Sequence, residues 1–336
     1  MADGLREADH VDANSLPQCI AVTHPHVARY RKTRLLEQDH GPAGSQSLST
    51  IDQEVYGDPR HPIRFRIGNG GAGFTGLLRV LSESYIREHG NDFGIGWVAN
   101  HSRYSQLALL ADVVQVALTY EPDNEDLAIG EGWAVRVCRA FNDHFVLAGP
   151  ESDLGARTIV EGLRSIAQRN LVEDSGPQRL QQLIFHTRGD GSATYCKERS
   201  LWKAAGTDIE NSKWVKTYAV APYDALRRAE AEGAFLISDR ATFLSAKEDG
   251  VISSLRVHVE GGPELLNPCS ALVRDDATRM ACQEGANACD FAKWLSGSKA
   301  QDIIHDYGRD WKLEKPLFTV ATQKEFAEDD RLVPSR

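Results

Sequence analysis

Two polar loops contain the residues whose types and spacing could hold a ligand. The first, residues 68–73, is rich in glycine, and the second, residues 186–194, contains Arg188, Ser192 and Thr194. Glycines let backbone N–H groups come close to a ligand, and a helix start behind each loop favours an anion. The planar guanidinium of Arg188 suits carboxylate or phosphate-like oxygens. Together the two loops predict an anion-binding clamp.

Each loop also has another interpretation. Asp190 and Ser192 are residue types that commonly cap a helix, and Arg188 can pair with Asp190, so a purely structural role for the second loop stays open. The first loop matches the spacing G-x-G-x-x-G of dinucleotide sites, but Asp92 precedes its strand instead of ending it. No cofactor is therefore predicted.

Several titratable side chains are expected near the same crevice and could move protons near neutral pH. They are three histidines and three carboxylates: His101, His144, His186, Asp143, Asp190 and Glu121. The candidate catalytic residues are His101, His144, His186 and Asp190. Cys196 follows the second loop at a helix start, where packing is the favoured role over that of a nucleophile. Catalysis is thus an alternative to simple binding.

The elements that must position these loops are strands followed by helices. Residues 63–67 alternate with period two before the glycine loop, and residues 93–98 and 113–118 form two further strands, each followed by polar residues. Later strands are expected at 183–185 and 234–238, again followed by polar loops. Alternating strands and helices build a mostly parallel sheet that binds ligands beyond the carboxyl ends of its strands.

The composition is that of a globular protein. The chain has 336 residues, 38 Lys and Arg against 48 Asp and Glu, a net charge of −10 and 41% hydrophobic residues. The acidic balance argues against a nucleic-acid partner. No stretch approaches the roughly 18 apolar residues of a spanning helix, so no membrane insertion is expected. The first 30 residues lack the apolar core of a secretory signal, which predicts a cytoplasmic protein.

No metal site is predicted. The six cysteines contain no CxxC pair and are expected to be free thiols. His24 and His26 lie in a polar N-terminal region that lacks a cysteine or carboxylate cluster at ligand spacing. A partly ordered extension is the expectation for that region.

A set of separated motifs occurs in one order between residues 63 and 322. They are Asn142-Asp143-x-Phe145-Val146-Leu147-Ala148-Gly149-Pro150, Arg188-Gly189-Asp190-x-Ser192-x-Thr194, Leu201-Trp202, Ser238-Asp239-Arg240-x-Thr242-Phe243-Leu244, Glu260-Gly261-Gly262-Pro263-Glu264-Leu265-Leu266-Asn267-Pro268 and Phe291-x-x-Trp294-Leu295. In these motifs and their order the chain resembles the tungstate-binding proteins of bacterial ABC uptake systems.

The resemblance implies an α/β fold of the type II periplasmic-binding-protein-like kind, with two lobes and a ligand cleft between them. Strands at 145–148 and 270–273 are expected to cross between the lobes. The expected units are a polar N-terminal extension (1–62), the first part of lobe 1 (63–144), lobe 2 (145–273), C-terminal helices that return to lobe 1 (274–322) and a tail (323–336).

The expected ligand-binding residues follow from the loops and the resemblance. They are Asn69, Gly70, Gly71, Ala72, Thr75, His101, Ser102, Tyr120, Arg188, Asp190, Ser192, Thr194, Asp239 and Arg240. Where the family carries threonines and a serine around its oxyanion, this chain has Asn69, Gly70, Gly71 and Ala72. These hydroxyl donors are therefore missing, and altered specificity is expected.

The leading prediction is a cytoplasmic binding protein for a small anion, either an oxyanion or a carboxylate. The alternative is an intracellular enzyme on the same scaffold, with proton-transfer chemistry of the isomerase, cyclase or lyase kind on an organic acid or specialised metabolite. A third class is an interaction module in which residues 1–62 are the functional element. The oligomeric state is not indicated by the sequence.

Overall fold

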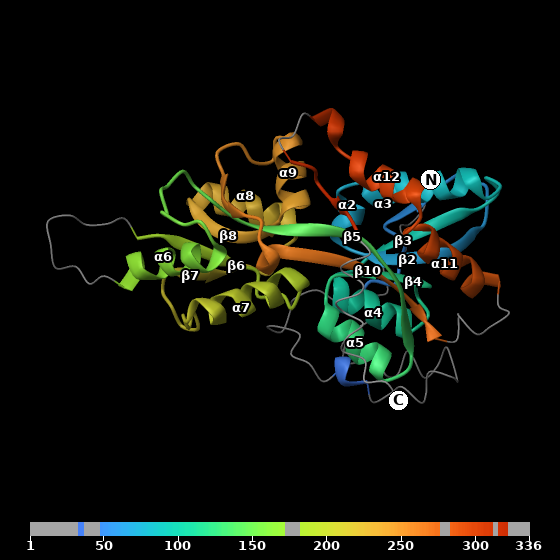
Figure 1. The fold of residues 1–336 in the computed structure, drawn as a ribbon, viewed down its shortest axis with the longest axis horizontal. Coiled ribbons are helices and arrows are strands. Elements are labelled where there is room, and N and C mark those ends of the chain that lie inside the picture. Colours follow the sequence, from blue (N-terminus) through green and yellow to red (C-terminus); the bar gives the residue numbers. More distant parts are fainter. Residues whose placement is uncertain (1–32, 37–47, 172–181, 276–282, 312–314, 322–336) are drawn as a thin grey trace, which may run out of the picture.

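The protein has two parts, each a sheet with helices on its faces, which are joined through the long strands β5 (Ala134–Gly149) and β10 (Leu266–Arg274) (Figure 1). This α/β architecture with two lobes is the one the sequence predicted. The computed structural model describes residues 33–36, 48–171, 182–275, 283–311 and 315–321.

Lobe 1 is a sheet covered on both faces. Its strands, in spatial order, are β1 (Glu54–Tyr56), β3 (Gly94–Ala99), β2 (Ile63–Asn69), β4 (Val116–Thr119), β10 and the first part of β5. One face packs against α2 (Gly71–Phe74), α3 (Leu77–Glu88), α11 (Gln283–Trp294) and α12 (Ser298–Asp306). The other packs against α4 (Ser102–Leu110), α5 (Pro122–Gly130) and η3 (Arg34–Leu36). Because both faces are covered, β2 to β4 are mainly apolar and buried.

Lobe 2 repeats this layered arrangement around a smaller sheet. Its strands are the second part of β5, β8 (Ala234–Asp239), β6 (Ile184–Thr187), β7 (Val215–Thr217) and β9 (Arg256–Glu260). One core lies under α6 (Ile159–Leu171) and α7 (Ala193–Ala205), and the other under α8 (Pro222–Glu232) and α9 (Arg240–Glu248). The short elements η4 (Pro263–Leu265), η5 (Arg309–Trp311) and β11 (Thr319–Val320) complete the described chain.

Strand β5 belongs to both lobes. Its residues up to His144 pair with β10, whereas those from Phe145 onward pair with β8 and β9. The partner of β5 therefore changes between His144 and Phe145. The return strand differs from the expectation of a strand at 270–273: β10 begins at Leu266, because residues 266–268 already pair with β5.

Strands β1, β7, β9 and β11 and the first half of β5 were not foreseen in the sequence. Residues 54–56, inside the predicted polar extension, form β1 and pair antiparallel with β3. The first half of β5 also carries no clear alternation, since both of its faces are covered. Most of residues 1–62 and all of 323–336 lie outside the described residues. No helix of the described ranges is long and apolar enough to cross a membrane.

Candidate ligand cleft

The loops that follow β2, β3, β4 and β6, together with the end of β8, line one cavity between the lobes. These are the carboxyl ends of strands, where α/β proteins bind their ligands. The cavity has a volume of about 460 Å³. It is lined by Ser49, Ile51, Gln53, Gly70, Gly71, Phe74, Ala99, Asn100, His101, Ser102, Tyr120, Asp143, Arg188, Ser192, Ala193, Thr194, Ala221, Pro222, Asp239 and Asn267.

The structure brings many of the expected ligand-binding residues together at this cavity, from both lobes. Those that line it are Gly70, Gly71, His101, Ser102, Tyr120, Arg188, Ser192, Thr194 and Asp239. The expected residues that are not part of its lining are Asn69, Ala72, Thr75, Asp190, Arg240, His144 and His186. Each of these has another structural position.

Asn69 holds the glycine loop instead of facing the cavity. Its Nδ2 donates to the carbonyl oxygen of Leu118 at 2.9 Å, and its Oδ1 accepts from the Gly73 amide at 3.1 Å. Ala72 is buried in the core of lobe 1, and the Thr75 hydroxyl donates back to the Ala72 carbonyl at 3.3 Å. The loop is thus shaped by its buried residues, while Gly70 and Gly71 reach the cavity.

Asp190 is buried beneath the second loop and holds Ser192 and Arg188 in place. Its Oδ1 accepts the Ser192 hydroxyl at 2.6 Å and the Ser192 amide at 3.1 Å, and its Oδ2 is paired with Arg188. The Arg188 Nε has no hydrogen-bond partner among the described residues, and Arg188 lines the cavity. A buried N–H donor without a partner is costly, so a ligand oxygen at this position would be stabilising. Both open interpretations of the loop therefore apply: Ser192 caps α7 and Asp190 pairs with Arg188, while Arg188 still reaches the cleft.

Besides the four-residue α2, which follows Gly70, four longer helices begin at the cavity wall. Their N-cap residues are His101 of α4, Ser192 of α7, Ala221 of α8 and Asp239 of α9. All four N-cap residues line the cavity. Arg240, the first residue of α9, is buried outside the lining. One helix start of lobe 1 and three of lobe 2 thus direct their positive ends at the same space.

The three histidines are not brought together. His101 lines the cleft and packs against the Tyr104 ring at a centroid distance of 4.1 Å. His144 Nε2 lies 3.0 Å from the Thr319 hydroxyl, and burial lowers the pKa of His144 to about 4. His186 Nε2 lies 3.3 Å from a carboxylate oxygen of Glu232, and burial lowers its pKa as well. Among the described residues, this separates the histidines of the candidate catalytic set.

Asp143 is the most buried carboxylate of the cleft. It is 3% exposed, and the two hydrogen bonds it accepts, from the His144 amide at 2.7 Å and the Ala241 amide at 3.4 Å, both end on Oδ1. Burial, and then the neighbouring Asp239 carboxylate, raise the pKa of Asp143 well above its usual range. The protonated form is therefore favoured, and it offers an O–H donor to the cavity.

Part of the lining carries no signal in the sequence. Ser49 and Asn100 exchange two hydrogen bonds, at 2.8 and 2.9 Å, and the Gln53 amide donates to the Trp97 carbonyl at 2.7 Å. These bonds place the segment with Ile51 at the rim of the cleft, although it lies in the region expected to be an extension. Asn267, by contrast, pairs with Asp143 in register and lies in one of the quoted motifs.

A second cavity of about 410 Å³ adjoins the first and shares Tyr120, Ala193 and Asn267 with it. Glu121 and Cys196 lie in its wall. Cys196 is exposed and so does not have the packing role expected from the sequence. Desolvation by the groups around its sulfur, followed by the Glu121 carboxylate, raises the pKa of the Cys196 thiol to about 11. Cys196 is therefore held as a thiol and lacks the activated thiolate of a nucleophile.

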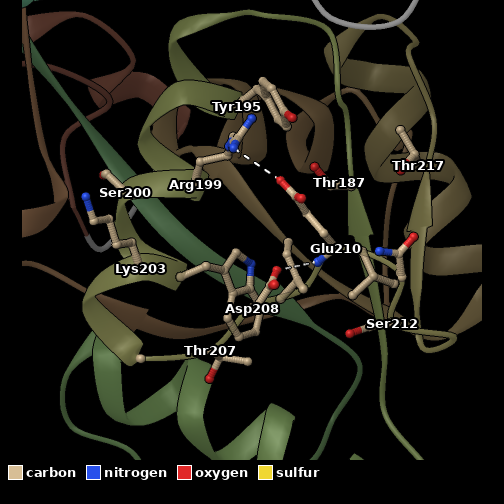
Figure 2. A pocket seen from close by; sticks show the side chains of 15 residues that line it. Thr187, Tyr195, Arg199, Ser200, Lys203, Thr207, Asp208, Glu210, Ser212 and Thr217 are labelled. Atoms are coloured by element: carbon tan, nitrogen blue, oxygen red, sulfur yellow. Dashed lines mark hydrogen bonds and ion pairs between the residues drawn. The ribbon is translucent and has the colours of Figure 1, made fainter.

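The largest of the three cavities, about 680 Å³, lies on lobe 2 alone. Figure 2 shows that α7 and the segment after it form its walls, with Tyr195, Arg199 and Lys203 on one side. Arg199 is exposed and pairs with Glu210 at 3.3 Å. The pocket lacks contributions from lobe 1 and from Arg188. We therefore take the cleft between the lobes as the candidate site.

The family is established by comparison with known proteins. A family model described as a PBP superfamily domain matches residues 43–298. The chain belongs to the PBP superfamily.

The described residues contain no group of three or more His, Cys, Asp or Glu side chains that could hold a metal ion.

Relatives within the PBP superfamily have been described as tungstate-binding. The tungstate-binding protein TupA of Peptoclostridium acidaminophilum is 33% identical over 257 residues, which are 73% of this chain and 81% of that protein. TupA of Campylobacter jejuni subsp. jejuni is 26% identical over 248 residues, 73% of this chain and 86% of that protein. The solved structure of TupA from Desulfovibrio alaskensis G20 superposes with a TM-score of 0.62 at 24% identity, covering 78% of this chain and 99% of that chain. The predicted resemblance is confirmed.

Proposed function

We propose that this protein binds a small anion in the cleft between its lobes. The observation that carries the proposal is the set of four helix starts that meet at one cavity beside Arg188. Each helix start is equivalent to about half a positive charge, so the four supply about two charges before the Asp239 carboxylate that caps α9 is counted. The tungstate-binding names of the two TupA relatives agree with this chemistry.

The acidic side chains of the cleft are compatible with an anion. The Asp239 carboxylate accepts the Thr242 amide at 2.8 Å and so caps α9. Asp143 is favoured in its protonated form, in which it donates a hydrogen bond to an oxygen of the ligand. Asp239 thus offsets the positive start of α9, whereas protonated Asp143 adds no negative charge, which leaves the starts of α4, α7 and α8 and the Arg188 Nε to face an anion.

We further propose that the ligand differs from tungstate. Gly70 and Gly71 supply only backbone groups to the lobe 1 wall, where the resemblance implies hydroxyl side chains in the family. Ser102 is a hydroxyl of this wall, and its Oγ already accepts the Tyr120 amide at 3.0 Å. No second function is proposed, because only His101 of the three candidate catalytic histidines lines the cleft.

Isothermal titration with tungstate, molybdate, phosphate and small carboxylates tests the proposal. We expect at least one anion to bind, and Arg188→Gln to lower its affinity about 10- to 100-fold, the usual effect of losing a hydrogen bond to a charged group. Arg199→Gln is the matched control, because Arg199 is exposed and pairs with Glu210 outside the cleft. The proposal is wrong if the full panel, including longer organic acids, gives no binding, or if Arg188→Gln binds like the wild type.

A further inference from the structure

The cleft has an apolar wall on the lobe 1 side. Phe74 is 54% exposed and Ile51 is 49% exposed, although both are large apolar side chains, and both line the cavity. Across from lobe 1, Ala221 and Pro222 add apolar surface from lobe 2. Exposed apolar surface gathered in a cleft indicates a binding function, whereas scattered apolar residues do not.

Phe74 is held in place by the structure beneath it. Its ring packs edge-to-face against Trp97 at a centroid distance of 5.1 Å, and the Trp97 Nε1 donates to the Asn69 carbonyl at 2.7 Å. A Cβ at Gly73 would come within 2.1 Å of the Trp97 ring, so glycine is required for this close approach. The indole therefore supports Phe74 from behind and leaves much of the Phe74 ring open to the cavity.

The volume of the cleft exceeds the needs of an inorganic oxyanion. Its volume is about 460 Å³. An ion with four oxygens occupies the space of about four waters, on the order of 120 Å³. The cleft volume lies within the range of about 300–1,000 Å³ that organic ligands occupy. Most of the cavity is thus left for something other than the charged group.

We propose that the ligand is an organic acid, whose anionic group contacts Arg188 and the helix starts and whose apolar body packs on Phe74 and Ile51. This inference rests on the proposed function, since it needs an anion in the cleft. The charged and apolar parts of such a ligand match the two walls of the cleft. The polar groups of Arg188, Ser192 and Thr194 come from lobe 2, and the exposed side chains of Phe74 and Ile51 come from lobe 1. Binding would bury the apolar wall. The binding free energy therefore becomes more favourable with each carbon added to the ligand.

A series of straight-chain carboxylates from acetate to octanoate, titrated beside tungstate and phosphate, tests this inference. We expect the affinity to rise about fourfold with each methylene group until the wall is covered. In the double variant Phe74→Ala/Ile51→Ala the gain in affinity per methylene group should become much smaller. The more conservative variant Phe74→Leu should keep part of this gain. Val80→Ala is the control, because Val80 is 37% exposed but does not line the cleft.

The outcomes separate this inference from the proposed function. If tungstate or phosphate binds and the carboxylate series is flat or absent, the organic-acid inference is overturned while anion binding stands. If no anion of any kind binds, both are overturned. If the series rises equally in the double variant and its circular dichroism matches that of the wild type, the apolar wall of Phe74 and Ile51 is not the contact, and the inference also fails.

Discussion

The two walls of the cleft differ in how their helices begin. In lobe 2, the starts of α7 and α9 are capped by their own side chains, Ser192 and Asp239. In lobe 1, α4 begins after His101 and α5, at the adjoining cavity, begins after Glu121, and neither residue makes a capping hydrogen bond through its side chain. In the short α2, the Asn69 Oδ1 accepts the Gly73 amide at 3.1 Å. The amides of a first helical turn need a partner from outside the helix.

The difference indicates a division of roles between the lobes. In lobe 2, α7 and α9 are capped by their own side chains and Asp190 pairs with Arg188, whereas α8 has no side-chain cap and the Arg188 Nε has no partner among the described residues. Lobe 1 keeps helix starts without N-cap side-chain bonds, glycine backbone and exposed Phe74, all of which gain from a ligand or from water. Lobe 2 is therefore the prepared half of the site, and lobe 1 is the half that a ligand completes.

The largest effects are expected for two glutamates at the start of α5, on the lobe 1 side. Glu121 is 7% exposed, and its Oε1 has no hydrogen-bond partner among the described residues. Burial raises its pKa from 4.5 to about 7. At low pH the folded and unfolded states both keep the proton. Between about pH 4.5 and 7 only the unfolded state ionises, so stability falls as the pH rises, by about 3 kcal/mol in all.

Glu121→Gln should therefore stabilise the protein by up to about 3 kcal/mol above pH 7 and leave it unchanged near pH 4. Urea unfolding at several pH values measures this. Glu125→Gln is the contrasting variant, because Glu125 accepts hydrogen bonds from Thr119, Arg136 and Ser270 at 2.7, 3.0 and 2.5 Å. It should destabilise by about 3–5 kcal/mol. A Glu121→Gln effect independent of pH would show that its charge is not the cause.

The glycine loop of lobe 1 provides the next prediction. Gly73→Ala places a methyl group 2.1 Å from the Trp97 ring, so it should lower the free energy of unfolding by about 2 kcal/mol. At Gly71 nothing lies within 4 Å of the position that a Cβ would take, and the residue lines the cleft. Gly71→Ala should keep its stability and weaken ligand binding. Urea unfolding and titration of the two variants, side by side, distinguish the supporting glycine from the exposed one; equal stabilities would contradict this account.

The sequence predicted the strand ends of the cleft well because the pattern there is local. Alternation over residues 63–67 and the glycines behind it are sufficient to place Gly70 and Gly71 at the end of β2. The placement of His144 could not be obtained in the same way. Neighbouring residues of a strand point to opposite sides, so Asp143 faces the cleft and His144 faces Thr319. Which side is the cleft depends on the register of β5 with β10, a long-range property.

The rim of the cleft depends even more on long-range contacts, which the sequence does not reveal. Ile51 is positioned by hydrogen bonds of neighbouring residues to Asn100 and Trp97, which lie far along the chain. A three-residue strand such as β1 is too short for a periodic signal. The sequence thus indicates the groups that lobe 2 prepares, Arg188 and Ser192, better than the apolar wall that lobe 1 adds.

The smallest effects are expected from the caps that distinguish the two walls. Ser192 Oγ accepts the Tyr195 amide at 3.4 Å, so Ser192→Ala should cost about 1 kcal/mol. Ala221 precedes α8 with φ −57° and ψ 152° and offers no side-chain cap. Ala221→Ser should therefore add a cap and stabilise by about 0.5–1 kcal/mol. Urea unfolding measures both changes, and the two signs should be opposite.

Titration of the same variants tests whether caps and ligand compete. At Ala221 the added hydroxyl satisfies an amide at the cavity wall, so the ligand has less to gain there, and its affinity should fall while stability rises. A capping side chain introduced at His101, the start of α4 in lobe 1, should likewise raise stability and lower affinity, because the His101 side chain makes no capping hydrogen bond. If Ala221→Ser instead stabilises the protein and leaves the affinity unchanged, the α8 amides do not contact the ligand. The groups of lobe 2 that contact the anion would then be the starts of α7 and α9 and the Arg188 side chain.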